Sequence, residues 1–523
     1  MGRPEVAGRA GGRSAWQSGT VPAVPPSRSA LTPDAARPHD REPRVPHVVV
    51  VGGGISGLAA AWYLARAHVP VTVTLLESSP VLGGKLAVSD VAGISVDEGA
   101  ESFVAGRPEA LLLAREVGLE SELVEPAEHR GSVWSRGAAR RVPRGQFLGV
   151  PTDLRSLAAS GLISLPGLLR IPLDRALPAA DVGEDVAVGS LVGSRLGREV
   201  VDRLVEPLLG GVYAGRADML SMAATMPALF RELRHERSLL AATRRVVRGG
   251  AEVAGARRGV PFRGMVGGVG RLPGAVAAAL VGHGVQIRTR ATVRGMVADG
   301  SSGWRLEVGP ASAPEFLRAD AVVLATPAPA ASRLLGHDAP RVAMELGSIE
   351  YASVAVVALA LRAADVRAPL VGSGMLVPPV EGRAVKALTY ADRKWDWLSQ
   401  AAEHEGLRII RASLGRYGDE SVLQRDDEDL LALTRVDLAH LLGVLAAPVD
   451  SRVTRWGGAL PQYAVGHRAR VERIRTGLRD VPTLALCGAA FDGVGVAACV
   501  GSAQEAAGRV VRALSQQAES SRG

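Results

Sequence analysis

A glycine-rich stretch at residues 52–57 constrains the fold of this chain more than any other feature. It reads Gly-Gly-Gly-Ile-Ser-Gly, which fits the pattern G-x-G-x-x-G, and it follows the β-branched run at residues 48–51. Such a run predicts a parallel strand buried on both faces, and residues 58–67 predict a helix. In this unit the glycines permit a tight turn, a close backbone approach to a pyrophosphate and close packing of the helix on the strand. The helix N-terminus offers amides to an anion, so we predict a dinucleotide-binding site.

The residues that follow this unit decide which dinucleotide is favoured. A second predicted strand, residues 71–76, ends at Glu77, where a carboxylate would bind ribose hydroxyls and repel a 2′-phosphate, so NADP is disfavoured. The chain continues through Ser78 to Gly83, Gly84 and Lys85. Taken alone, this glycine pair fits an ordinary loop turn equally well. Together with the first unit it predicts another close backbone approach, as the longer FAD molecule requires, and we favour FAD over NAD.

Composition excludes several other classes of function. The net charge is +8, yet no dense run of Lys and Arg with interleaved aromatic residues occurs, so we predict no nucleic-acid partner. The two cysteines, Cys487 and Cys499, lack the spacing of a metal site or a disulfide framework, which fits a reducing cytoplasm, and we predict no metal. No run of 18 apolar residues predicts a membrane span. Residues 1–45 lack the apolar segment of a secretory signal and predict a disordered Pro/Arg-rich extension.

Patterning beyond the first unit predicts an α/β protein of several parts. Interrupted strand and helix signals predict a split Rossmann-like FAD-binding domain built from residues 46–125, 265–340 and 450–515. A mostly helical domain is expected at 126–264, and an inserted α+β substrate-binding domain at 341–449. Apolar stretches in 126–264 fit either a peripheral contact with a membrane surface or the core of their own domain.

Several motifs together resemble the protoporphyrinogen/coproporphyrinogen oxidase family of the flavin amine oxidase superfamily. These are VVVVGGGISGLAAAWYL, LLESSPVLGGK, GGVGRLP, RWGGALPQYAVGH and, most telling, the central run VEPLLGGVYAGRADMLSMAATMPALF. Amine oxidases and carotenoid desaturases share the first two motifs but not the central run. The resemblance implies an amine oxidase-like (p-hydroxybenzoate hydroxylase-like) architecture. It also implies a FAD enzyme of haem biosynthesis that removes six electrons from a porphyrinogen and passes them to O2, giving H2O2.

The family motifs also imply which residues contact FAD. They are Gly52, Gly53, Gly54, Ile55, Ser56, Gly57, Glu77, Ser78, Gly84, Lys85, Gly99, Ala100, Glu101, Ser102, Val293, Trp456, Val494, Gly495 and Val496. Val293 would offer backbone groups to the adenine end. Lys85 stands where some relatives have Trp or Arg, which puts its role in doubt. For Glu98 and Glu101, a solvated loop position is an equally good interpretation of the side chains.

Substrate residues are predicted from charge. Propionates favour Arg, which binds carboxylates through two parallel hydrogen bonds, and Arg130, Arg136 and Arg144 lie in a basic stretch that could also be an exposed hairpin. Tyr213, in the central run, is the fourth residue predicted to contact the substrate. No catalytic side chain is predicted, because the flavin N5 would accept the hydride.

The substrate and partners follow from the resemblance. We favour the bacterial branch that oxidises coproporphyrinogen III, with protoporphyrinogen IX as the alternative. Another amine oxidase-like or desaturase-like enzyme and a non-enzymatic escort protein are the further alternatives. The expected location is the cytoplasm, with membrane contact left open, and the product could pass to a ferrochelatase. The sequence predicts no oligomeric state.

Overall fold

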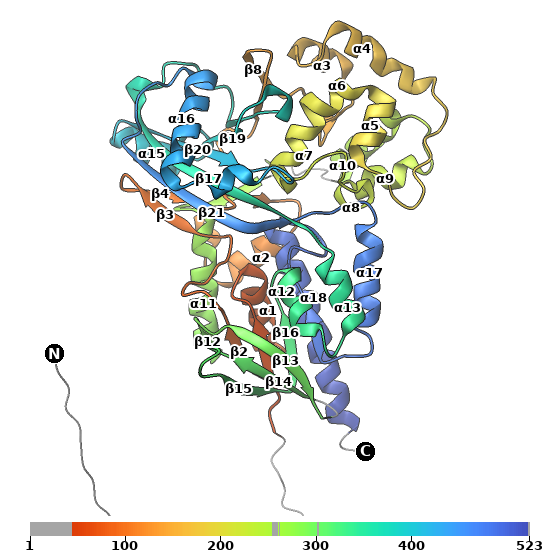
Figure 1. The fold of residues 1–523 in the computed structure, drawn as a ribbon, viewed down its shortest axis with the longest axis vertical. Coiled ribbons are helices and arrows are strands. Elements are labelled where there is room, and N and C mark those ends of the chain that lie inside the picture. Colours follow the sequence, from red (N-terminus) through yellow and green to blue (C-terminus); the bar gives the residue numbers. More distant parts are fainter. Residues whose placement is uncertain (1–43, 254–259, 261, 301–302, 521–523) are drawn as a thin grey trace, which may run out of the picture. The chain divides into compact units, whose positions relative to one another are not determined.

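The computed structural model of the protein describes residues 44–253, 260, 262–300 and 303–520 (Figure 1). Residues Val45–Gly523 form one compact unit. The extension predicted at residues 1–45 lies almost entirely outside the described residues. Within the described residues, no helix is both long and apolar enough to cross a membrane.

A parallel sheet of five strands carries the glycine-rich turn. Its order is β12 (Gln286–Arg288), β2 (Thr72–Leu76), β1 (His47–Val51), β16 (Ala321–Leu324) and β22 (Leu484–Leu486). Val48 and Val50 face a core shared with α1 (Ile55–Ala65), α11 (Leu272–Gly282) and α18 (Val496–Ser520). Val49 and Val51 face the opposite core. The β-branched run is therefore continuous because both faces of β1 are buried, which confirms the predicted central strand.

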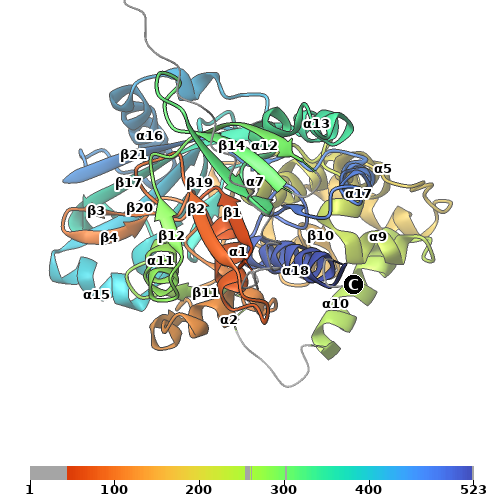
Figure 2. The same cartoon turned by 90° about the horizontal axis from the view of Figure 1, so that it is seen from below.

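The opposite face of this sheet is covered by a small antiparallel sheet and two helices (Figure 2). The small sheet consists of β13 (Val293–Asp299), β14 (Gly303–Val308) and β15 (Glu315–Ala319). The helices α12 (Ala328–Leu335) and α13 (Pro340–Gly347) contribute to the same core. The sheet thus lies between two layers, as in doubly wound nucleotide-binding folds.

A second, mostly antiparallel sheet has seven strands. Its order is β21 (Asp450–Pro461), β17 (Tyr351–Arg362), β20 (Leu407–Leu414), β19 (Val385–Tyr390), β18 (Gly374–Leu376), β7 (Ser132–Ser135) and β8 (Ala138–Arg141). One face packs on α16 (Asp427–Leu442) and the other on α14 (Ala391–Lys394) and α15 (Asp396–His404). The sheet draws strands from the ranges predicted for all three domains, whose boundaries stay a prediction.

A further part of the molecule, between residues 154 and 253, is helical and has its own core. It consists of α3 (Leu154–Ser160), α4 (Leu165–Arg170), η2 (Ile171–Arg175), α5 (Val188–Leu196), α6 (Arg198–Val200), η3 (Val201–Val205), α7 (Glu206–Tyr213), α8 (Met222–Thr225), α9 (Pro227–Leu233) and α10 (Leu239–Val253). A buried ion pair ties it together, because Arg195 donates to Asp174 at 2.6 Å. Most apolar side chains of this part face that core, but Leu165, Leu169 and Leu173 of α4 and η2 do not.

Candidate cofactor site

The turn between β1 and α1 has the geometry that its glycines predict. Gly52 adopts a φ of 109°, which favours glycine, and its amide donates to the Leu76 carbonyl at 2.7 Å. A Cβ added to Gly57 would lie 1.8 Å from the Gly52 carbonyl oxygen. The third glycine therefore lets α1 pack directly on the turn, as predicted. The carboxylate of Glu77, just after β2, accepts from the Gly53 amide at 2.6 Å, which places it at the turn.

The second glycine pair presses against the first turn. The Gly83 amide donates to the Gly53 carbonyl at 2.9 Å. A Cβ on Gly84 would lie 3.3 Å from the Gly54 Cα, and Gly84 has a φ of 58°. The glycine pair therefore packs tightly against the first turn, which excludes an ordinary loop turn, and its close approach to a bound FAD stays a prediction.

Open space lies beside Gly54 of this double turn. Gly54 caps α1 without a side-chain hydrogen bond, so no side chain occupies the first amides of the helix. A Cβ added to Gly54 or to Gly495 would meet no atom within 4 Å. The side chain of Lys85 is reached by solvent, yet desolvation by the surrounding protein lowers its pKa, as expected for a side chain in a hollow. Amides at a helix N-terminus beside open space fit a bound pyrophosphate.

The turn at residues 97–102 is held by ion pairs of its two glutamates. Glu98 pairs with Arg452 at 2.5 Å, and the Glu98 carbonyl accepts from the Trp456 indole at 2.9 Å. Glu101 pairs with Lys394 and Arg411, both at 2.6 Å. The interpretation of both carboxylates as solvated loop residues is therefore wrong.

Neighbouring positive charges keep the Glu101 carboxyl ionised despite its burial. Burial alone would raise the pKa of this carboxyl, but Lys394 and Arg411 outweigh burial and lower the pKa to about 2. Because the Glu101 side chain is engaged by these two cations, the backbone of residues 99–102 is the part left for a cofactor. A Cβ on Gly99 would lie 1.9 Å from the Lys85 carbonyl, so this turn also approaches the second glycine pair.

The loop before α18 is anchored by a buried tyrosine. The Tyr463 hydroxyl donates to the Ala489 carbonyl at 2.6 Å and accepts from the Gly493 amide at 2.8 Å. Its ring stacks on His467 with centroids 4.0 Å apart. Desolvation lowers the pKa of His467 to about 4, so this imidazole is neutral at pH 7. The loop therefore presents residues 494–496 from a rigid support.

Comparison with known proteins shows which family the chain belongs to. A model of flavin-containing amine oxidoreductases matches residues 55–511. The chain belongs to this family. The coproporphyrinogen III oxidase of Mycobacterium bovis is 38% identical over 473 residues, 90% of this chain and 98% of that protein. The protein of the same name from Bacillus subtilis is 32% identical over 87% of this chain and 95% of its own length. The protoporphyrinogen oxidase of Bos taurus is 31% identical over 89% and 98%.

Solved structures of flavin amine oxidoreductases share the fold. A protein from Exiguobacterium sp. 255-15, assigned as a protoporphyrinogen oxidase, superimposes with a TM-score of 0.77 at 29% identity over 89% of this chain and 98% of its own. A putrescine oxidase variant gives 0.62 at 16% identity, over 89% and 99%, which supports the fold alone. The predicted α/β fold, the resemblance and the FAD cofactor are thus confirmed, and the chain is a FAD-dependent oxidoreductase.

In this flavin oxidoreductase the predicted FAD residues gather in two connected places. The glycine turn, Glu77, Ser78, Gly84 and Lys85 lie at the ends of β1 and β2. Val293 begins β13 just after Ala291, whose amide donates to the Glu77 carbonyl at 2.8 Å. Trp456 and residues 99–102 meet each other beside Lys85, and Val496 begins α18, which packs on α1. Contact of each residue with FAD stays a prediction.

The predicted substrate residues are not brought together. Arg136 pairs with Glu199 and donates to the Leu162 carbonyl at 2.7 Å, so its charge is engaged within the helical part. Arg130 and Arg144 are exposed before and after the hairpin of β7 and β8. Tyr213 is buried, and its ring lies 5.6 Å from that of Tyr463. Of the four residues, only Tyr213 is therefore linked to the loop before α18.

Sequence reasoning missed three charged residues at a cavity of the second sheet. Glu206 comes from α7, Lys386 from β19, and Arg416 from the turn after β20. The signal that could have indicated this place is the scarcity of lysine, which occurs only at positions 85, 386 and 394.

Proposed function

We propose that this flavin oxidoreductase oxidises coproporphyrinogen III to coproporphyrin III. Six electrons would leave in three two-electron steps, and O2 would accept each pair and form H2O2. The observation that carries the proposal is the match to proteins named coproporphyrinogen III oxidase along nearly their whole length, at up to 38% identity. Amine oxidases share the fold at far lower identity, which favours a porphyrinogen over an amine.

Bound FAD would supply a hydride acceptor. The residues of this chain would orient the cofactor and the substrate and set the electrostatic field around them. The amides of α1 and the close approach at Gly54 would hold the pyrophosphate, and Glu77 the ribose. The ion pairs of Glu101 keep the turn at residues 99–102 in place. Neutral His467 supports Tyr463, whose hydroxyl holds the loop before α18. Each two-electron step also releases one proton from the porphyrinogen, which solvent can accept, and the groups named here bind and orient.

A direct assay tests the proposal. The purified, FAD-loaded protein is given coproporphyrinogen III or protoporphyrinogen IX in air, and porphyrin fluorescence is followed above the rate of auto-oxidation. We expect preferential formation of coproporphyrin, with three H2O2 produced for each porphyrin. Equal or faster oxidation of protoporphyrinogen IX would favour the second candidate, which the bovine relative and the Exiguobacterium structure support. Turnover of neither substrate would refute both.

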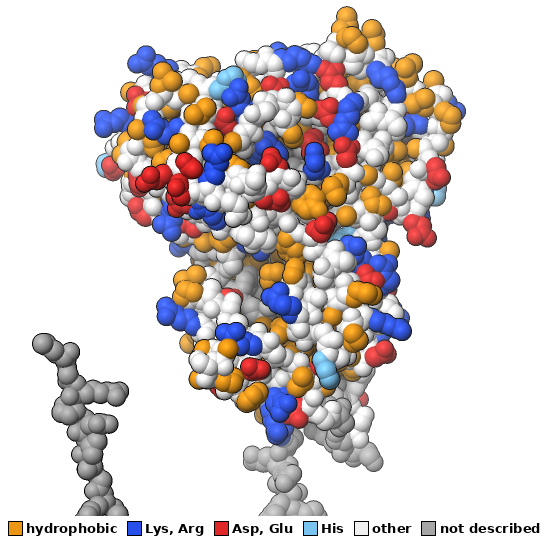
Figure 3. Space-filling model, viewed as in Figure 1, with side chains coloured by type: hydrophobic (Ala, Val, Ile, Leu, Met, Phe, Trp, Pro, Cys, Tyr) orange, Lys and Arg blue, Asp and Glu red, His pale blue; other side chains and the backbone are white. Residues whose placement is uncertain are grey.

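We further propose that the enzyme works in the cytoplasm and touches the membrane surface at α4 and η2. Leu165, Leu169 and Leu173 are 69%, 68% and 51% exposed, whereas most other leucines of the helical part pack in its core. Figure 3 shows hydrophobic side chains at the end of the molecule where α4 lies in Figure 1. Arg175, exposed just after Leu173, would favour anionic headgroups. Hand-over of the product to a ferrochelatase fits this function and is proposed with it.

A further inference from the structure

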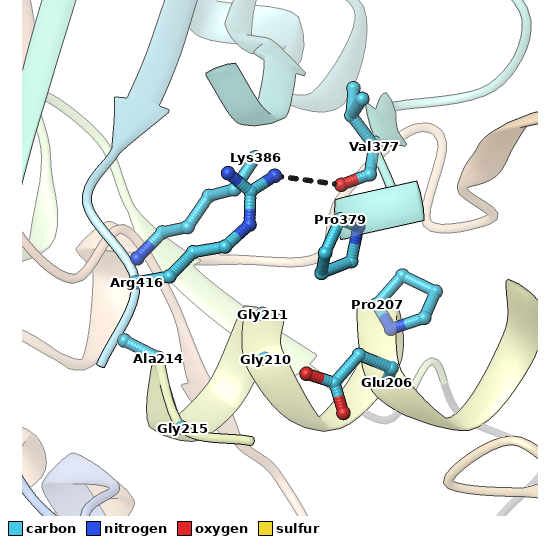
Figure 4. Close-up of a pocket in the computed structure, with 10 residues that line it drawn as sticks. All are labelled: Glu206, Pro207, Gly210, Gly211, Ala214, Gly215, Val377, Pro379, Lys386 and Arg416. Atoms are coloured by element: carbon cyan, nitrogen blue, oxygen red, sulfur yellow. Dashed lines mark hydrogen bonds between the residues drawn. The ribbon is translucent and has the colours of Figure 1, made fainter. Parts of the chain in front are cut away.

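A charged cavity lies between the helical part and the second sheet. Figure 4 shows Lys386 and Arg416 on its sheet side, with Glu206 and Pro207 of α7 facing them. The enclosed volume of the cavity is about 20 Å³, room for about one water molecule, and glycines and prolines line most of its remaining wall. The space therefore admits a small head group, such as one carboxylate of a molecule that lies outside it.

Positive charge in the cavity is not balanced by ion pairs. The Lys386 ammonium donates to the Gly415 carbonyl at 2.7 Å. The Arg416 guanidinium donates to the carbonyls of Val377 at 3.0 Å and Arg383 at 3.1 Å. Neither forms an ion pair with a carboxylate in the described part of the chain. Carbonyl dipoles compensate a half-buried cation only in part, so a further anion would be bound favourably.

The surroundings of these cations show the cost of leaving them without an anion. Desolvation lowers the pKa of both side chains. For Lys386, with Arg416 adding repulsion, the value falls to about 7, whereas for Arg416 the carboxylates of Asp419, Glu206 and Asp437 oppose the lowering without cancelling it. Glu206, across the cavity, accepts from the Ala217 amide at 2.6 Å, and desolvation raises the pKa of its carboxyl. An entering carboxylate would reverse the penalty on Lys386 and Arg416.

Lysine is rare in this chain, and one of its few lysines lies in this cavity. Only three of the 61 basic residues of the chain are lysines. Lys394 is ion-paired with Glu101, and Lys85 lies in the hollow beside the glycine turns. Lys386 is the third, and it donates to the neutral carbonyl of Gly415. A lysine ammonium shifts its pKa readily on burial, so its binding of a carboxylate depends on pH, whereas a guanidinium keeps its charge throughout.

The helix α7 connects this cavity to the cofactor side. Its first residue, Glu206, and Gly210 line the cavity, and its last residue, Tyr213, packs on Tyr463, which holds the loop before α18. We propose that Lys386 and Arg416 bind one propionate of the porphyrinogen, while the macrocycle lies on the cofactor side of α7. This inference rests on the proposed function and names the charged contacts that the basic hairpin does not supply.

Binding of the product tests the contact without turnover. The dissociation constants of coproporphyrin III and of its tetramethyl ester are measured by fluorescence for the FAD-loaded protein and for Lys386→Met and Arg416→Met. We expect binding of the free acid to weaken at least tenfold in each variant, with no change for the uncharged ester. The flavin spectrum should not change. Removal of an unpaired half-buried charge should leave the melting temperature the same or higher, whereas a purely structural lysine would lower it.

A glycine substitution tests the cavity independently of charge. A Cβ on Gly210 would meet its nearest atom at 3.7 Å, so Gly210→Ala fits the helix but enters the cavity. The matched control is Gly274→Ala in α11, where the added Cβ meets nothing within 4 Å. Both changes should raise the melting temperature, because alanine favours helix. Only Gly210→Ala should raise the KM for coproporphyrinogen III, several-fold, with kcat little changed.

Failure of the inference differs from failure of the proposed function. If the unchanged protein oxidises coproporphyrinogen III but the variants bind the free acid as well as it does, the inference is overturned and the function stands. If the unchanged protein oxidises no porphyrinogen, the function fails, and acetylation of Lys386, read by mass spectrometry with Lys394 as internal reference, still tests the anion site. Saturating glutarate should then slow acetylation of Lys386 at least threefold. Absence of protection would overturn the inference.

Discussion

Burial and the neighbouring Arg416 lower the pKa of Lys386 to about 7, which predicts a pH dependence of ligand binding. Below pH 7 the ammonium is charged and binds a carboxylate, whereas above pH 7 a proton must be taken up first. We expect the affinity for coproporphyrin III to fall as pH rises from 6 to 8.5, with a slope approaching tenfold per unit. In Lys386→Met this slope should become much shallower.

The other charges around Lys386 do not mimic this effect. Arg416 stays charged over the range, and Asp437 of α16 is engaged by the Val385 amide at 2.9 Å and by Arg383. Glu206 has a raised pKa, so its ionisation also weakens anion binding as pH rises, but this persists in the variant. An equal slope in both proteins would show that Glu206, and not Lys386, governs the titration.

Glu101 provides a prediction about stability. Its pKa is lowered in the folded protein to about 2, so its ion pairs stabilise the fold above the unfolded pKa and are lost as pH falls through about 2. Glu101→Gln leaves Arg411, 7% exposed, without its carboxylate and should cost about 3 kcal/mol at pH 7. Urea unfolding of both proteins should show this difference at pH 5–8 and a smaller one at pH 3. A constant difference across pH would contradict it.

The partners of Glu101 also show where sequence reasoning ends at the residue scale. Lys394 and Arg411 lie 293 and 310 positions along the chain from it. No local pattern joins residues so far apart, and the solvated loop was an equally good interpretation for that reason. The place of Glu77 was predictable, because the strand–turn–helix unit fixes it within one local segment.

At the scale of elements, the two glycines at the start of α1 should respond differently to alanine. Gly57→Ala would force a Cβ to 1.8 Å from the Gly52 carbonyl, so both folding and FAD binding should be lost. Gly54→Ala meets no protein atom, and Gly54 has a φ of −70°, which alanine adopts freely. Its apoprotein should keep its melting temperature but bind FAD at least tenfold more weakly. Retention of full flavin absorbance by Gly54→Ala would contradict the proposed path of the pyrophosphate.

Elements were predictable where their signal is local. The strands at β1, β2, β16 and β22 and the helices α1 and α18 follow from runs and periodicity within single segments. Membership of a sheet was not predictable, because β7 and β18 pair in parallel although their residues, such as Ser132 and Met375, are far apart in the chain. The charged cavity shares this origin, since α7, β19 and the turn after β20 meet only in the folded protein.

At the scale of the whole molecule, the exposed leucines predict binding to lipid. Apolar side chains this exposed gain free energy on entering a membrane interface, about 1.5–3 kcal/mol for a leucine that becomes fully buried. Leu165→Ser/Leu169→Ser should therefore weaken co-sedimentation with vesicles of mixed neutral and anionic phospholipid at least tenfold. Folding should not suffer, because neither side chain belongs to a core.

A single exposed leucine elsewhere supplies the control for this experiment. Leu445, 81% exposed and beyond α16, is as apolar as Leu165 but stands on another part of the molecule. Leu445→Ser should leave vesicle binding unchanged, and both proteins should oxidise dissolved coproporphyrinogen III at the rate of the unchanged enzyme. If Leu445→Ser weakened binding as much as the double variant, non-specific hydrophobic adsorption would explain the effect. If the unchanged protein bound no vesicles at any lipid content, the leucines of α4 would have to face another protein.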